Sequence, residues 1–141
     1  MYIKCRADIK VSNCEAVAKV FREILKNEDE VDQQKEHFWA MGLTTKNRVL
    51  YLELVSLGCL TESVVHPREV FKSAIIKSAC NLIFCHNHPS GESGPSNNDI
   101  TITQVLKKGG EILGFKVLDH IILGENNIFS FAEEGLLKEV K

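Results

Sequence analysis

The first quarter of the chain shows two hydrophobic patterns of different period. Apolar and polar residues alternate over residues 3–11, which predicts a β-strand with one buried face. From residue 13 to about 26 the apolar residues recur at helical spacing instead, which predicts an amphipathic helix. Ser12 and Glu15 have the spacing of a capping box and would start that helix. The polar stretch that follows, NEDEVDQQK, is expected to be a loop.

The middle of the chain predicts a hairpin, a helix and a buried strand in succession. Two apolar segments flank a turn-rich TTKN sequence, which indicates a β-hairpin over residues 36–56. Pro67 suits the first turn of a helix, because the N–H that proline lacks is not needed there. The apolar run NLIFCHNH over 81–88 predicts a buried strand that ends in histidines. The segment PSGESGP is typical of a loop.

The last third alternates again between helix and strand. A third helix is expected to begin at Ser96 and to end near Gly109 and Gly110. The segment FKVLDHIIL predicts a strand, NIFSF a further one, and AEEGLLKEV a final short helix. Because no linker interrupts this order, the pattern predicts one α/β (α+β) domain over residues 1–141, with a mixed central sheet flanked by helices.

Composition and charge narrow the classes of function. The chain has 141 residues, 44% of them hydrophobic and 26% charged, which suits one soluble domain with a core. The formal net charge of −2 provides no global attraction to nucleic acid or to an anionic membrane, although a local basic patch stays possible. No apolar run is long enough for a membrane span, and the charged N-terminus does not resemble a signal peptide.

The cysteines point to a reducing compartment. There are five of them and no CxxC pair, at positions 5, 14, 59, 80 and 85. An odd number of scattered cysteines without an export signal predicts free thiols and a cytoplasmic location.

The segment CHNHPSGESGPSNND carries the candidate chemistry. His86 and His88 are two positions apart on a predicted strand, so both side chains point to the same face and can converge on one metal ion. Asp99 follows in the first turn of the next helix and could be a third ligand. Two histidines and a carboxylate leave a fourth position for water, which is the ligand set of a catalytic zinc site.

A simpler interpretation of the same residues remains open. Ser96 and Asp99 are three positions apart ahead of a helix, so they could form only a helix cap. A His-x-His pair is also weak evidence for a metal when it stands alone. The two roles are compatible, because Ser96 can cap the helix while Asp99 faces a metal.

The combined spacing resembles the JAMM (MPN+) metalloprotease pattern of His-x-His, seven residues, Ser, two residues and Asp. The matching residues are His86, His88, Ser96 and Asp99. HNHPSG, EILGFKVLDHIILG and GCLTESVVHPREVFKSAI resemble the RadC branch of this superfamily, although Cys59 and Thr61 stand where Thr and Asn are expected. The resemblance covers about residues 30–131. It implies a single JAMM/MPN-like (cytidine-deaminase-like) domain that binds one zinc ion per chain.

The resemblance also implies a mechanism. In JAMM enzymes a glutamate near the start of an early strand is the general acid/base, and Glu36 matches that position best, with Glu53 as the second candidate. The resemblance gives Ser96 the role of hydrogen-bond donor to the developing oxyanion. The implied reaction is hydrolysis of an amide or isopeptide bond in a peptide or isopeptide substrate whose identity the sequence leaves open.

Two neighbouring residues leave a question open. Asp119 and His120 point to opposite faces of their predicted strand, so both cannot face one site. One of them could orient a metal ligand, and a buried, hydrogen-bonded role in the core is an equal alternative.

Other classes of function stay open at this point. A non-catalytic accessory or binding module of DNA metabolism is the alternative, because the RadC name is associated with DNA repair. Only about 35 residues precede the matching region, and they contain no glycine-rich hairpin, so no separate helix-hairpin-helix domain is expected. A zinc site kept only for structure is a third possibility. A homodimer is possible, and nothing in the sequence requires one.

Overall fold

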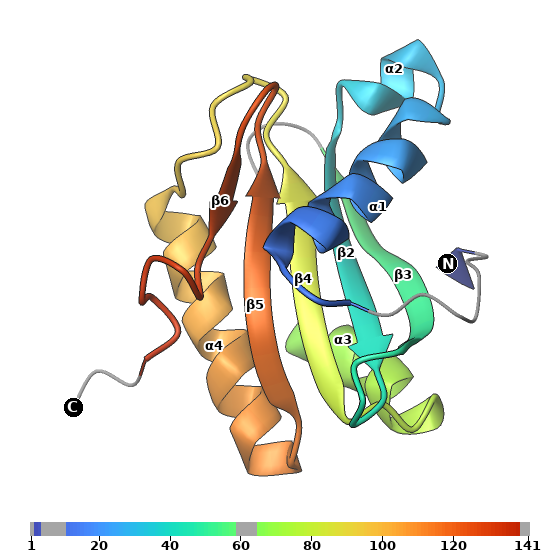
Figure 1. The fold of residues 1–141 in the computed structure, drawn as a ribbon, viewed down its shortest axis with the longest axis vertical. Helices are drawn as coiled ribbons and strands as arrows, with labels where there is room; N and C mark the ends of the chain where they lie inside the picture. The colour runs from blue at the N-terminus through green and yellow to red at the C-terminus, as the bar shows by residue number, and fades with distance from the viewer. Residues whose placement is uncertain (1, 4–10, 59–64, 139–141) are drawn as a thin grey trace.

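The computed structural model describes residues 2–3, 11–58 and 65–138 (Figure 1). The helices are α1 (Cys14–Lys26), α2 (Glu30–Gln33), α3 (Pro67–Ile76) and α4 (Asn97–Leu113). The strands are β1 (Tyr2–Ile3), β2 (Glu36–Leu43), β3 (Val49–Gly58), β4 (Asn81–Asn87), β5 (Lys116–Leu123) and β6 (Ile128–Ser130).

The strands form one mixed sheet in the order β1-β3-β2-β4-β5-β6. β4 and β5 are parallel, and α4 makes the crossover between them, whereas every other neighbouring pair is antiparallel. β4 therefore lies in the middle of the sheet. The start of β2, the end of β4 and the turn between β5 and β6 lie at the same end of the sheet, which is uppermost in Figure 1.

Helices cover both faces of the sheet. α1 packs on one face through Val17, Ala18 and Phe21, and α3 and α4 pack on the other through residues such as Phe71 and Leu106. Successive residues of the central strands therefore enter different core clusters, and both faces must be apolar. This explains the nearly continuous hydrophobic sequence of β2 and β4. The predicted α/β (α+β) fold, with a mixed sheet flanked by helices, is confirmed.

Two expectations near the first helix were wrong. The N-cap of α1 is Asn13, whose side-chain oxygen accepts a hydrogen bond from the Ala16 N–H at 2.8 Å, and not Ser12. The acidic stretch expected to be a loop contains α2, a single turn whose Gln33 side chain donates to the carbonyl of Glu28 at 2.7 Å. Local composition does not distinguish such a turn from a loop.

The predicted end of the third helix was also wrong. α4 continues through Gly109 and Gly110 to Leu113 and is capped by Gly114, which has a left-handed φ of 87°. The two internal glycines are needed for packing, since a Cβ on Gly109 would lie 2.9 Å from the Phe71 ring. A Cβ on Gly110 would lie 3.3 Å from the carbonyl oxygen of Phe115. These glycines let α4 approach its neighbours closely and do not terminate it.

The ends of the chain differ from expectation in part. Of the helix expected over 132–140, residues 132–138 form turns instead, and residues 139 and 140 lie outside the described residues. Gly135 has a φ of 73° that interrupts helical geometry. Of the strand expected over 3–11, the structure describes Ile3, which pairs with Leu52, and Val11; residues 4–10 lie outside the described residues. The hairpin, the helix from Pro67 and the strands β4, β5 and β6 are confirmed.

The described cysteines and helices bear on two further expectations. Cys14, Cys80 and Cys85 are free thiols, whereas Cys5 and Cys59 lie outside the described residues, as does Thr61. Within the described part of the chain, no helix has the length and hydrophobicity that crossing a membrane requires.

Candidate metal centre

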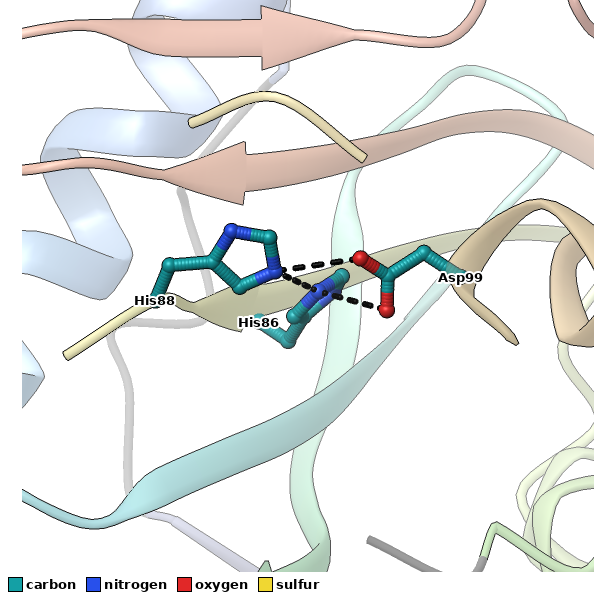
Figure 2. A group of neighbouring side chains, drawn as sticks. All are labelled: His86, His88 and Asp99. Carbon is teal, nitrogen blue, oxygen red and sulfur yellow. Dashed lines mark hydrogen bonds and ion pairs between the residues drawn. The ribbon is translucent and has the colours of Figure 1, made fainter. Parts of the chain in front are cut away.

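The candidate ligands come from the end of β4 and the start of α4. β4 is paired on both sides up to this end, with His86 opposite Phe38 of β2 and Ile122 of β5. His86 and His88 lie two residues apart and point to the α4 side of the sheet, where the Asp99 carboxylate reaches them from the first helical turn (Figure 2).

The three side chains meet through specific atoms. His86 Nε2 lies 3.2 Å from Asp99 Oδ1, and His88 Nε2 lies 3.1 Å from Asp99 Oδ2. The two Nε2 atoms are 2.9 Å apart. Four ligands arranged tetrahedrally at about 2.0–2.1 Å from a zinc ion lie about 3.3–3.4 Å from one another. Two nitrogens and one oxygen therefore converge at close to the spacing of a metal coordination sphere, and among the described residues this group could hold a metal ion.

Burial and charge make this group costly without a cation. His86 is 1% exposed and Asp99 is 9% exposed. Burial raises the pKa of Asp99, but hydrogen bonds with His86 and His88 outweigh it and hold the pKa of this carboxyl far below its ordinary value. The same hydrogen bond to Asp99 raises the pKa of His88. Asp99 is thus an anion that attracts positive charge to the meeting point of the two imidazoles.

Asp99 belongs to a helix cap as well as to the cluster. Its Oδ2 accepts a hydrogen bond from the Ser96 N–H at 2.9 Å, and its own N–H donates to Ser96 Oγ at 3.1 Å. These reciprocal bonds form a capping box. The two interpretations of the sequence therefore coexist, because the box aims the carboxylate at the histidines. Ser96 is exposed, and its hydroxyl hydrogen is not used by the cap.

The loop after β4 fixes the orientation of His88. The main-chain N–H of His88 donates to the carbonyl of Leu123 at 2.9 Å, and His88 Nδ1 lies 2.8 Å from the Glu92 carbonyl. A carbonyl oxygen can only accept, so Nδ1 carries a hydrogen there. In neutral His88 the lone pair is then on Nε2, the atom that faces Asp99. An outer hydrogen bond of this kind is typical of metal-binding histidines.

Glu36 lies at the same end of the sheet. It is the first residue of β2, two positions before Phe38, which is paired with His86. Burial raises the pKa of Glu36, and the charges of His86, Asp99 and His88 act on it from nearby. Asn87 fixes the flanking main chain, since its amide donates to the Lys35 carbonyl at 3.0 Å while its oxygen accepts from the residue 37 N–H at 2.6 Å.

Glu53, the second candidate for the general base, has different neighbours. It is 7% exposed on β3, and the hydroxyl of Ser73 in α3 donates to its carboxylate. Tyr2 donates in turn to Ser73 at 3.2 Å. These contacts lead away from the histidine cluster. The structure thus places Glu36 within electrostatic reach of the cluster, and the catalytic roles of Glu36 and Ser96 stay predictions.

His120 contacts the cluster directly. Its Nε2 lies 2.7 Å from His86 Nδ1, and its Nδ1 lies 2.5 Å from Thr103 Oγ1. Thr103 was not singled out from the sequence, although its position four residues after Asp99 places both on one side of α4. Asp119 points to the other face and accepts a hydrogen bond from Ser130 at 2.6 Å. Of the neighbouring pair, His120 is the one next to the candidate ligands.

Comparison with known proteins agrees with this geometry. The family model described as the RadC-like JAB domain matches residues 11–136. A UPF0758 protein of Desulforudis audaxviator is 60% identical over 102 residues, covering 72% of this chain and 44% of its own. One from Desulforamulus reducens is 53% identical over 110 residues, covering 78% and 48%, and one from Methanosarcina mazei 50% over 107, covering 76% and 47%.

These relatives set both the family and the limits of the comparison. Their shared name, UPF0758 protein, states no activity. The chain spans about half the length of the curated relatives that it matches, so their whole-protein activity does not transfer to it directly. The family match covers most of the chain and includes the His86, His88 and Asp99 cluster. The chain therefore belongs to the RadC-like JAB domain family.

Proposed function

We propose that this domain is a zinc-dependent hydrolase that cleaves an amide or isopeptide bond in a peptide substrate. One observation carries the proposal: two histidine Nε2 atoms and both oxygens of the Asp99 carboxylate converge at 2.9–3.2 Å. Three protein ligands of this type leave a fourth position for water, whereas structural zinc sites are usually closed by four protein ligands.

The residues around the cluster support hydrolysis without a covalent intermediate. Zinc, when bound by His86, His88 and Asp99, would lower the pKa of water from about 15.7 to about 7. Glu36 would accept the proton from water and deliver it to the leaving nitrogen. Its raised pKa suits a group that must both take and return a proton. The Ser96 hydroxyl, exposed beside Asp99, would donate a hydrogen bond to the developing oxyanion.

Metal analysis is the first test. We expect freshly purified protein to hold about one zinc per chain, and His86→Ala or His88→Ala to lose it. His66→Ala is the matched control, because His66 is exposed at the start of α3, outside the cluster. Equal metal content in the wild type and all three variants would contradict the proposed site.

Hydrolysis needs a separate test on the metal-loaded protein. We expect a panel of peptides and isopeptide-linked peptides to contain a substrate that the wild type cleaves, and Glu36→Gln to keep the zinc but lose the cleavage. Glu53→Gln tests the second candidate base, and we expect it to retain activity. A protein that binds zinc and cleaves nothing in the panel would instead favour a metal site kept for structure.

A further inference from the structure

His120 is a fully buried polar side chain in the core behind the candidate metal centre. It is 0% exposed, and its ring stacks on Phe131 with a centroid distance of 4.8 Å. Phe38 and Phe84 contact its ring edge to face, at 5.4 and 6.4 Å. Such surroundings favour the neutral imidazole, since a buried charge among aromatic rings is costly. Among the residues that the structure describes, its two nitrogens contact His86 and Thr103.

The direction of the hydrogen bonds follows from a main-chain carbonyl. The Asp99 carbonyl oxygen can only accept, so Thr103 Oγ1 donates to it at 2.6 Å. The threonine hydroxyl has a single hydrogen, which this bond uses. Its contact with His120 Nδ1 at 2.5 Å therefore requires the hydrogen on Nδ1. A neutral His120 then has its lone pair on Nε2, where it faces His86 Nδ1 at 2.7 Å.

The same reasoning assigns the hydrogen of His86. Since His120 Nε2 must accept, His86 Nδ1 must carry the hydrogen and donate it. The lone pair of neutral His86 is then on Nε2, 3.2 Å from Asp99 Oδ1 and 2.9 Å from His88 Nε2, so these three atoms are held together by a cation, either a metal ion or a proton shared with Asp99. The opposite tautomer would place the lone pairs of two buried rings against each other at 2.7 Å. The main-chain carbonyl of Asp99 thus fixes the donor and the acceptor of each hydrogen bond from Thr103 to His86.

We propose that His120 and Thr103 are positioning residues that hold His86 in the tautomer able to bind metal. The proposal depends on the proposed function, because it takes His86 as a metal ligand. The chain of hydrogen bonds begins at one candidate ligand, His86, and ends on the main-chain carbonyl of another, Asp99. It crosses β4, β5 and α4, so it fixes the distance between these elements as well as the orientation of one ring. His88 obtains its tautomer separately, from the Glu92 carbonyl.

Four variants separate hydrogen bonding from packing. His120→Phe keeps an aromatic ring in the Phe131 stack but can neither accept nor donate. His120→Gln restores one acceptor and one donor. Thr103→Val keeps the shape of the side chain and removes the hydroxyl. Thr101→Val is the matched control, because the Thr101 hydroxyl also donates four residues back, to Asn97 at 3.0 Å, but is exposed.

Zinc affinity, measured by competition with a chromophoric chelator, is the first readout. We expect His120→Phe and Thr103→Val to weaken zinc binding by about 10–100-fold, the loss typical when an outer partner of a metal ligand is removed. We expect His120→Gln to recover most of that loss and Thr101→Val to bind as the wild type does. Wild-type affinity in His120→Phe and Thr103→Val would overturn the proposal, and so would equal losses in His120→Phe and His120→Gln.

Imidazole ¹⁵N spectra of the metal-free protein are the second readout. At a pH where the rings are neutral, we expect His86 and His120 to carry hydrogen on Nδ1 in the wild type. We expect His86 to become a mixture of tautomers in His120→Phe. An Nε2–H form of His86 in the wild type would overturn the proposal. This spectrum requires no metal, so a wild type that fails to bind zinc refutes the proposed function while the hydrogen-bond chain is still tested.

Discussion

The Asp99 carboxylate accepts a hydrogen bond from the Ser96 N–H while its two oxygens face the imidazoles of His86 and His88. One side chain thus caps the N-terminus of α4 and also completes the candidate site. Its anionic charge matters to the histidines, whereas its geometry matters to the helix. The two contributions differ in chemistry, so they can be separated by substitution.

Ser96→Ala and Asp99→Asn should therefore affect different properties, the first mainly stability and the second mainly zinc binding. Ser96→Ala removes the hydroxyl that accepts from the Asp99 N–H, and we expect a loss of about 1 kcal/mol in the free energy of unfolding with zinc still bound. Asp99→Asn keeps an oxygen to accept from the Ser96 N–H but removes the charge. We expect it to change stability less and to weaken zinc binding by more than about 100-fold, beyond the loss typical for outer residues.

Urea denaturation of the metal-free variants and zinc competition measure the two effects. The histidine Nε2 atoms remain in both proteins, so a loss of affinity in Asp99→Asn reports on the carboxylate itself. Equal zinc affinity in the two variants would show that Asp99 serves only the helix cap.

At the scale of elements, the β4–α4 loop is held in place by contacts that begin at α1. The Arg22 guanidinium donates to the carbonyls of Gly124 and Asn127, each at 2.9 Å, and so fixes the turn between β5 and β6. In that turn, the Glu125 N–H donates to the Gly91 carbonyl at 2.9 Å. The loop that orients His88 is therefore hydrogen-bonded to the β5–β6 turn, and that turn is itself held by α1, which packs on the other face of the sheet from α4.

Arg22→Ala should loosen this end of the molecule before it affects the core. A hydrogen bond from a charged group contributes about 1.5–3 kcal/mol to a folded structure. The variant loses one such bond that is partly buried, to Gly124, so the turn should open more often. We expect faster amide exchange at Glu125 and across the β4–α4 loop, with little change in the centre of β4. Hydrogen exchange read by mass spectrometry measures this, with Lys19→Ala on the exposed side of α1 as the control. Unchanged amide exchange in the loop would show that Arg22 does not stabilise it.

At the scale of the whole molecule, the candidate metal would join a central strand of the sheet to a helix that covers one of its faces. His86 and His88 belong to a central strand, and Asp99 belongs to a helix that covers one face. The unfolded chain would hold these groups far apart and bind an ion weakly. Zinc that binds the folded state alone must therefore raise the free energy of unfolding.

Chelation should consequently lower the melting temperature. At a free zinc concentration of about 1,000 times Kd, binding contributes about 4 kcal/mol to stability. Each kcal/mol corresponds to a shift of about 2–8 °C for domains of this size range. We expect EDTA to lower the melting temperature of the wild type by about 10 °C or more, measured by calorimetry. Asp99→Asn is the control and should show a much smaller shift, so an equal shift in both proteins would contradict this origin of the stability.

The extent to which the sequence predicted these features differs between local and distant contacts. The strand NLIFCHNH, the helix from Pro67 and the hairpin were predictable, because hydrophobic period and turn residues are local properties. Gly109 and Gly110 misled the prediction of a helix end, since their role is a close approach to Phe71 and Phe115. Nothing near them in the sequence indicates that contact.

The sequence by itself determined that His86 and His88 share a face, because strand geometry repeats every two residues, and that Asp99 starts a helix, because Ser96 precedes it by three positions. Only the tertiary structure decided which distant groups surround them. Sheet order placed Glu36 of β2 and His120 of β5 on either side of β4, whereas Glu53 fell against α3. Neighbours in a sheet are fixed by packing of the whole chain, and no local pattern encodes that choice.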